Sequence, residues 1–308
     1  MKSVNYKTPL RYPGGKSRAM KFLLPRMPKE YTSFVEPFVG GGSVFLAAKK
    51  QNPNADYWIN DLYHNLYCFW VALRDEPENL VESLKNIKNN SRELVTKKQI
   101  KEMNLPKPDA LVFTKRVTEK AKKMFLETKE RIKNTNSDLD RAVCFFILNK
   151  CSFSGLTESG TFSAQASMQN FSDNSIDRLI KVSNAIQGVR ITNLDYRDVL
   201  KQAPGNSFIF FDPPYDILKG KKKNANALYG KSGALHKGFN HSEFATECDS
   251  VKNKFKLMIT YNNNDQIKER FSDYNQDCWD LTYTMRSTGD YNKDQKERKE
   301  LLITNYGD

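Results

Sequence analysis

Residues 33–50 have the sequence SFVEPFVGGGSVFLAAKK, which carries the strongest fold signal in the chain. The first residues form a short apolar run of the kind found in buried strands, and the residues from 43 onward fit a helix. The glycines at 40–42 lie between the two, where the backbone must turn sharply. The stretch therefore predicts a strand, a glycine turn and a helix.

Similar apolar runs recur along the chain. A strand over 57–59 ends at Asn60-Asp61 and precedes an aromatic helical stretch over 62–73, which gives a β-α-β-α pattern. Further strands are expected at 189–192, 208–211 and 257–260, with a final strand pair at 279–285 and 301–305. We therefore expect an α/β fold with a mainly parallel sheet and helices on both faces.

The character of the sequence changes between residues 75 and 138. This stretch is lysine-rich, weakly amphipathic and without strand signals, and Leu105-Pro106-Lys107-Pro108 interrupts it. A strongly apolar helix is expected over 139–150, then a polar loop over 151–170, and a second loop over 219–237. We interpret 75–195 as a mostly helical insertion and 1–74 with 196–308 as the α/β domain.

The composition narrows the class of protein. Lys and Arg number 49 against 36 Asp and Glu, a formal charge of +13, which favours a polyanionic partner such as nucleic acid over a merely soluble basic protein. The five cysteines are scattered without short paired spacing, and only three histidines accompany them, so the composition supports neither a disulfide framework nor a zinc site. The start lacks a signal-peptide core and no apolar run is long enough for a membrane helix, so we expect a cytoplasmic protein.

Several polar residues near the first strands could hold a ligand. The glycine turn would let backbone amides approach it, but Phe45 stands where the dinucleotide GxGxxG pattern has its last glycine. Asp61 could accept the hydroxyls of a ribose, cap the following helix, or do both. Lys16 follows two glycines, but Leu10 stands where a phosphate-binding loop needs a glycine, so this lysine is better suited to a ligand carboxylate.

The sequence Asp212-Pro213-Pro214-Tyr215 directly follows the apolar run at 208–211. It therefore lies at the carboxyl end of a strand, where ligand crevices of open α/β sheets form, and the two prolines fix the loop. Asp212 and the Pro213 carbonyl can accept both protons of an exocyclic amine, and Tyr215 can stack on a base swung out of a duplex. Simple strand termination by the prolines would not account for the flanking Asp and Tyr. The motif indicates methylation of a planar amine.

The chain resembles the DNA adenine methylase (Dam) family over essentially its whole length. The matching residues are 10–16, 35–46, Asn60-Asp61, Leu148-Asn149-Lys150, Gly155-Leu156, Asp212-Pro213-Pro214-Tyr215 and Arg286-Ser287. The resemblance implies a Rossmann-like methyltransferase sheet and a target-recognition region before the catalytic loop, which matches 75–195. It also implies S-adenosylmethionine as the cofactor and methyl transfer to adenine in double-stranded DNA after base flipping, by a monomer or a dimer.

The resemblance also implies roles for individual residues. The catalytic residues would be Asp212, Pro213, Pro214 and Tyr215, and the cofactor would be bound by Tyr12, Lys16, Glu36, Phe38, Gly40, Gly42, Asp61 and Asp212. DNA would be contacted by Lys150, Phe153, Ser154, Leu156, Glu158 and Arg286, and no metal is implied. Tyr12 stands where the family often has tryptophan. Glu158 stands where members that recognise GATC have arginine, and a carboxylate cannot make the bidentate guanine contact, so GATC recognition is not implied.

Two other functions remain open from the sequence. Methylation of cytosine or of a protein glutamine would use the same loop geometry, although Ser and Asn are the usual first residues of the loop in those relatives. A DNA-binding module that has lost catalysis would keep the fold. The glycine turn, Asp61 and Asp212 favour an enzyme over such a module, and a test of S-adenosylmethionine binding would separate the two.

Overall fold

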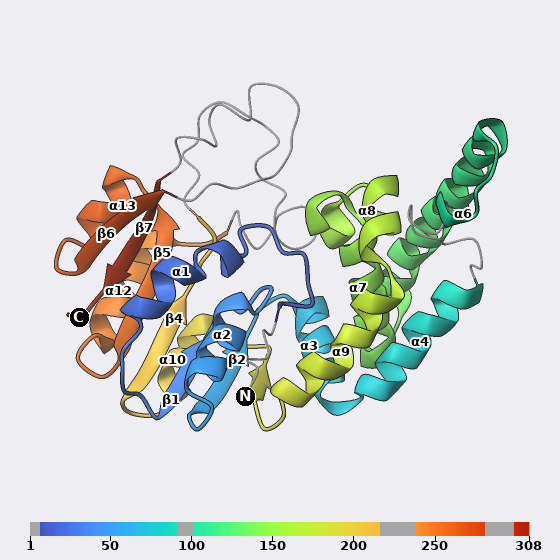
Figure 1. Ribbon diagram of the computed structural model, residues 1–308. Helices are drawn as coiled ribbons and strands as arrows, with labels where there is room; N and C mark the ends of the chain where they lie inside the picture. The colour runs from blue at the N-terminus through green and yellow to red at the C-terminus, as the bar shows by residue number, and fades with distance from the viewer. Residues whose placement is uncertain (1–6, 91–100, 216–237, 281–298, 308) are drawn as a thin grey trace. The chain divides into compact units, whose positions relative to one another are not determined.

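The computed structural model describes residues 7–90, 101–215, 238–280 and 299–307, which pack into two compact units (Figure 1). Unit 1 contains Met1–Gly14 and His64–Gln187, and unit 2 contains Gly15–Tyr63 and Gly188–Asp308. These boundaries differ from the expected division at 74/75 and 195/196, because the helix that follows Tyr63 packs with the other helices of unit 1. In the described ranges, no helix has both the length and the apolar character needed to cross a bilayer.

Unit 2 is built on a seven-stranded sheet with the order β3-β2-β1-β4-β5-β7-β6. The strands are β1 (Ser33–Glu36), β2 (Asp56–Asn60), β3 (Arg190–Thr192), β4 (Ser207–Phe211), β5 (Lys256–Asn262), β6 (Asn275–Asp280) and β7 (Lys299–Thr304). β1 to β5 run parallel, and β7 is antiparallel to both β5 and β6. The expected mainly parallel α/β sheet is confirmed. β6 begins at Asn275 rather than at Trp279, and residues 281–285 of the expected strand lie outside the described residues.

Helices cover both faces of this sheet. Its strands are therefore continuous apolar runs, without the alternation of apolar and polar residues that is typical of strands with one face in solvent. One face packs against α10 (Tyr196–Gln202), α12 (His241–Val251) and α13 (Asp265–Arg270) (Figure 1). On the opposite face, Phe45 of α2 (Ser43–Gln51) contacts Tyr57 of β2, which in turn contacts Phe34 of β1. Before β1, the chain forms η1 (Lys16–Arg18), α1 (Met20–Leu23) and η2 (Leu24–Arg26).

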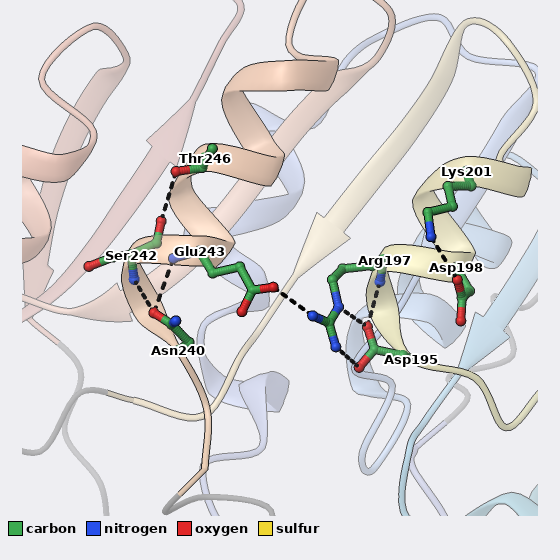
Figure 2. Close-up of polar contacts among 8 residues, drawn as sticks. All are labelled: Asp195, Arg197, Asp198, Lys201, Asn240, Ser242, Glu243 and Thr246. Atoms are coloured by element: carbon green, nitrogen blue, oxygen red, sulfur yellow. Dashed lines mark hydrogen bonds and ion pairs between the residues drawn. The ribbon is translucent and has the colours of Figure 1, made fainter.

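A polar network fixes the starts of α10 and α12 (Figure 2). Asp195 caps α10 by accepting from the Arg197 amide, and Asn240 caps α12 by accepting from the amides of Ser242 and Glu243. The Arg197 guanidinium bonds to Asp195 and, at 2.6 Å, to Glu243, which joins the two helix starts. Partly exposed ion pairs of this kind add little stability each, so the network mainly sets the relative position of the two helices.

Unit 1 is helical, as expected for the insertion. Its helices are α3 (His64–Asp75), α4 (Pro77–Asn90), α6 (Lys107–Asn134), α7 (Asp138–Cys151), α8 (Ala164–Asn170) and α9 (Asp173–Ala185), with 3₁₀ turns η3 (Phe153–Gly155) and η4 (Thr157–Ser159). α7 packs against α3, α4, α6 and α8, and every residue from Ala142 to Cys151 is buried (Figure 1). A helix that is buried on all sides belongs in a core, and α7 lies at the centre of the core of unit 1.

The expectation of a loop over 151–170 is wrong for its second half, where α8 forms. The Ser163 hydroxyl caps this helix by accepting from the Ala166 amide, and Ala166 and Met168 are buried. The helix is too short for its periodicity to stand out among polar residues, so packing in unit 1 decides its structure. The expected loop at 219–237 lies outside the described residues.

Candidate active site and DNA-recognition turn

Three acidic residues lie at the carboxyl ends of neighbouring parallel strands in unit 2. Glu36 is the last residue of β1, Asp61 follows β2, and Asp212 follows β4. β1 lies between β2 and β4, and the direction of winding reverses between β1 and β4. Ligands of open α/β sheets bind at such a switch point. The topology thus brings together residues that are far apart in the sequence.

Asp212 is held by two donors. The Lys16 ammonium lies 2.7 Å and 2.8 Å from its two carboxylate oxygens, and Lys16 itself is only 2% exposed. The Thr260 hydroxyl of β5 donates to Asp212 Oδ1 at 2.9 Å. Each carboxylate oxygen can accept about two hydrogen bonds, so within the described residues Oδ2, with a single donor, keeps capacity for another. Sequence reasoning missed Thr260, whose only signal is a hydroxyl inside an apolar strand.

Asp61 connects the glycine turn to the end of β2. Its carboxylate accepts from the Gly40 amide at 3.0 Å and from the Tyr63 amide at 3.0 Å, just before α3. Gly40 and Gly42 have φ values of 47° and 70°, the left-handed region that suits glycine. Burial raises the pKa of Asp61 to about 7, against the opposing effect of the Gly40 amide. Asp61 therefore contributes to the turn, as the capping alternative expected, while it faces the switch point.

Glu36 is the most deeply buried of the three carboxyl groups, with 2% exposure. Burial raises its pKa well above the ordinary value, and the charges of Asp212 and Asp61 add to the effect, while Lys16 opposes it. Among the residues that the structure describes, no donor reaches Glu36 Oε2. Buried acceptors almost always have a partner. Three carboxyl groups against one lysine thus form a site that suits a ligand with positive charge and hydrogen-bond donors.

Tyr215 is fixed beside this site through its hydroxyl. The hydroxyl donates to Glu300, a buried residue of β7, and the Tyr215 ring lies 6.0 Å from that of Tyr261. The Lys16 ammonium lies 4.9 Å from the Tyr215 ring centroid. Phe38, another predicted site residue, belongs to the adjacent aromatic cluster with Phe211 and its neighbours. The sequence signal for Glu300 was a lone acid in the apolar run of β7, and it was missed.

The comparisons with known proteins decide the family. Residues 12–285 match the model of the D12 class N6 adenine-specific DNA methyltransferases. The chain belongs to this family. It is an adenine-specific DNA methyltransferase, and DNA is its substrate.

Curated relatives agree, at low identity. The type II methyltransferase M1.LlaDCHI of Lactococcus lactis subsp. cremoris is 21% identical over 319 residues, covering 99% of this chain and 97% of the relative. The type II methyltransferase M.MjaIII of Methanocaldococcus jannaschii is 24% identical, covering 68% of this chain and 69% of the relative. A DNA adenine methylase of Vibrio cholerae is 22% identical, covering 68% and 65%.

In unit 1 of this methyltransferase, Pro9 and Arg11 contact the end of α7. Asn149 donates to the Arg11 carbonyl at 2.7 Å and accepts from the Arg11 amide at 2.9 Å, and the Lys150 ammonium donates to the Pro9 carbonyl. Lys150 is 7% exposed, and burial, together with the charge of Arg11, lowers its pKa to about 7. Lys150 therefore has a partner inside the protein, and its DNA contact stays a prediction. The same holds for the cofactor contact of Tyr12, a residue of unit 1.

The turn after α7 presents an exposed aromatic side chain. Phe153 is 48% exposed, and Ser154 and Thr157 have φ values of 53° and 52°, a left-handed conformation that is uncommon for residues other than glycine. The Ser152 hydroxyl accepts from the Thr157 amide, and a β-bridge joins Ser152 to Phe162. The turn is thus a braced structure, and strain of this kind is concentrated at functional sites.

Two further DNA-contact predictions fall in this turn and one outside the described residues. Leu156 is half-buried. Glu158 accepts from the Asn65 amide at 2.8 Å, and Asn65 accepts in turn from Arg141 at 3.2 Å. Arg286 lies outside the described residues. The Glu158 carboxylate is therefore oriented by its own unit.

Proposed function

We propose that this methyltransferase uses S-adenosylmethionine and binds it with Lys16, Glu36, Phe38, Gly40, Gly42, Asp61 and Asp212, with Tyr12 as the predicted contact from unit 1. The observation that carries the proposal is the buried Glu36 Oε2, which has no donor in the described part of the chain. The ammonium or a hydroxyl of the cofactor would be that donor. When bound, S-adenosylmethionine supplies a methyl group activated by a positively charged sulfur.

The chemistry of the pocket supports this cofactor. Glu36, Asp61 and Asp212 outnumber the single lysine, which favours a ligand with net positive charge. Asp61 lies at the end of β2, where acidic residues of this fold class accept ribose hydroxyls. The left-handed turn at Gly40 and Gly42 presents backbone rather than side chains to the ligand.

For the transfer step, Asp212 and the Pro213 carbonyl would each accept a hydrogen bond from the adenine amine, which loses one of its two protons as the new N–C bond forms. Asp212 Oδ2 is the oxygen with acceptor capacity left, because Lys16 and Thr260 both donate to Oδ1 and only Lys16 donates to Oδ2. These two hydrogen bonds orient the nitrogen lone pair toward the methyl group. Pro213 and Pro214 keep the loop rigid, and Tyr215, held by Glu300, stacks on the flipped base.

DNA recognition is assigned to unit 1 and its turn. Phe153 is an exposed apolar side chain, as is needed for a residue that inserts between bases during base flipping. The other predicted DNA contacts are Ser154, Leu156 and Glu158 in the same turn, Lys150 and Arg286. Because Glu158 is a carboxylate, we expect a recognised sequence other than GATC. The helices of unit 1 that lie within residues 75–195 act as the recognition region, the sheet of unit 2 carries the catalytic site, and the enzyme acts on DNA as a monomer or a dimer.

The deciding experiment compares Asp212→Ala, Asp212→Asn and a matched control. The control is Asp56→Ala, because Asp56 is an exposed carboxylate at the opposite end of the same sheet. Each protein is incubated with S-adenosylmethionine and mixed-sequence DNA, and modified bases are mapped by single-molecule sequencing. We expect kcat/KM to fall by roughly 100-fold or more in both Asp212 variants and to stay near wild type in the control. A folded Asp212→Ala variant that still methylates adenine would show the assignment to be wrong.

Isothermal titration calorimetry with S-adenosylmethionine measures the affinity for the proposed cofactor. Glu36→Gln is expected to weaken binding, because the amide keeps the side-chain shape but cannot supply the negative charge that a bound cation would favour on Glu36. A wild-type chain with no affinity for S-adenosylmethionine would instead favour a DNA-binding module without catalysis.

A further inference from the structure

Three side chains that commonly bind metal ions meet in unit 1. Cys68 Sγ lies 3.5 Å from His64 Nε2 and 3.5 Å from Asp138 Oδ1, and the last two atoms lie 3.9 Å apart. None of the three belongs to the residues proposed above for methyl transfer. The group was not visible in the sequence, because Asp138 is far from the other two along the chain.

Two helices carry the three ligand atoms. His64 and Cys68 lie one turn apart on α3, so both side chains are on one face of that helix. Asp138 is the first residue of α7, where the Ser137 hydroxyl caps the helix by accepting from the Asp140 amide. α3 packs directly against α7. The helices therefore set the distances among the three atoms.

These distances fit a tetrahedral metal site. Zinc binds cysteine sulfur at about 2.3 Å and histidine nitrogen or carboxylate oxygen at about 2.0–2.2 Å, so the ligand atoms of a tetrahedral site are roughly 3.3–3.6 Å apart. Two of the three separations are 3.5 Å, and the third, at 3.9 Å, needs only a small side-chain rotation. A thiolate and a carboxylate also balance the two charges of the ion.

We propose that His64, Cys68 and Asp138 form a binding site for a divalent cation of the zinc type, with water as the fourth ligand. The side chains of His64 and Asp138 are 53% and 68% exposed, so an ion can enter from solvent, while Cys68 is buried behind them. The ion would cross-link the start of α3 to the start of α7. None of its ligands belongs to the residues proposed for methyl transfer.

Hydrogen bonds hold the three side chains together when no ion is bound. The Cys68 thiol donates to Asp138, and burial, with the charge of Asp138, raises the pKa of the thiol to about 12. The charge of Arg141 acts in the opposite direction and favours the thiolate. Arg141 is itself held by the carbonyls of Ile132 and Thr135. Ion binding replaces the thiol proton.

The test is a titration of the full-length protein with Co²⁺, whose bond to a thiolate gives an absorption band in the near ultraviolet. We expect wild type to develop this band with one cobalt per chain and to lose it when zinc is added. Cys68→Ser should abolish the band. The matched control is Cys278→Ser, because Cys278 is the exposed cysteine of the chain and the other four are buried. A band that survives in Cys68→Ser, or that disappears in Cys278→Ser, would overturn the proposal.

The exposed ligands give a second test that does not disturb the core. His64→Gln and Asp138→Asn should each weaken cobalt binding by at least about tenfold. Zinc should raise the Tm of wild type, by an amount that grows with the logarithm of its concentration above Kd, because only the folded chain holds the three ligands together. Zinc should not raise the Tm of either variant. Wild type that binds no cobalt, or a zinc effect of equal size in all three proteins, would refute the site.

Discussion

The carboxylate of Asp212 illustrates how much of the chemistry depends on immediate neighbours. The aspartate is given by the motif, but its orientation is set by Lys16 and Thr260, which come from opposite ends of the chain. The buried Lys16 ammonium pairs with the half-buried carboxylate, and Thr260 occupies a second acceptor direction on Oδ1. Together they leave Oδ2 as the oxygen that faces further donors.

Thr260→Val removes the hydroxyl that donates to Asp212 while keeping the shape of the side chain. A hydrogen bond to a charged group is worth about 1.5–3 kcal/mol, so kcat/KM for methyl transfer should fall by roughly 10- to 100-fold. The control is Thr304→Val on β7, which removes a hydroxyl that bonds only to a backbone carbonyl, that of Tyr306. Steady-state kinetics with both variants decide, and equal losses in the two would argue against a role for Thr260.

The raised pKa of Asp61 predicts how the stability of the protein depends on pH. Its pKa in the folded protein is about 7, above the ordinary value of an aspartate, so its contribution to stability is complete below about pH 4 and is lost as the pH rises through 7. Asp61→Asn should therefore raise the Tm more at about pH 8.5 than at about pH 6, while it weakens S-adenosylmethionine binding. Asp56→Asn, at an exposed carboxylate, serves as the control. Thermal melts in which Asp61→Asn has the same effect at both pH values would contradict the buried-charge account.

Among the secondary-structure elements, those with a long apolar pattern were predictable and those defined by packing were not. The strands β1 to β5 and the helix α7 follow from runs of apolar residues. The turn of η3 and η4 does not, because its conformation depends on Asn149 and Ser152 at the end of α7 and on Arg11, which is distant in the sequence.

A comparison of Gly155 and Gly188 separates two reasons why alanine would destabilise the protein. One is the positive φ of the glycine, and the other is a clash between the added Cβ and a neighbouring residue. Both have positive φ, 75° and 72°, but a Cβ on Gly155 would lie 2.1 Å from the Arg11 carbonyl oxygen, whereas one on Gly188 would meet nothing within 4 Å. Gly188→Ala should cost about 1 kcal/mol, and Gly155→Ala roughly 3 kcal/mol or more. Urea unfolding of the two variants measures the difference. Similar losses would mean that the turn can move away from Arg11.

Over the whole chain, the excess of basic residues should govern the affinity for DNA. The formal charge is +13, and each phosphate contact releases counterions, so we expect Kd for DNA to rise steeply with salt. Between about 50 and 200 mM salt, an enzyme with several phosphate contacts should lose roughly 100-fold or more in affinity. Fluorescence anisotropy at several salt concentrations measures the slope. Binding of S-adenosylmethionine, which is proposed to depend on the buried Glu36, should change far less with salt. A DNA affinity that does not change with salt would contradict the phosphate contacts.

The sequence by itself determined the α/β class, the glycine turn, the helical insertion and the Asp212 motif, because each is encoded in neighbouring residues whose spacing follows strand, turn or helix geometry. The tertiary structure decided which distant residues meet. The order of β1, β2 and β4 places Glu36, Asp61 and Asp212 at one edge, and β5 and β7 add Thr260 and Glu300. The packing of α3 on α7 likewise brings Asp138 to Cys68. Such contacts depend on strand order and helix packing, and no local pattern in a single sequence records either.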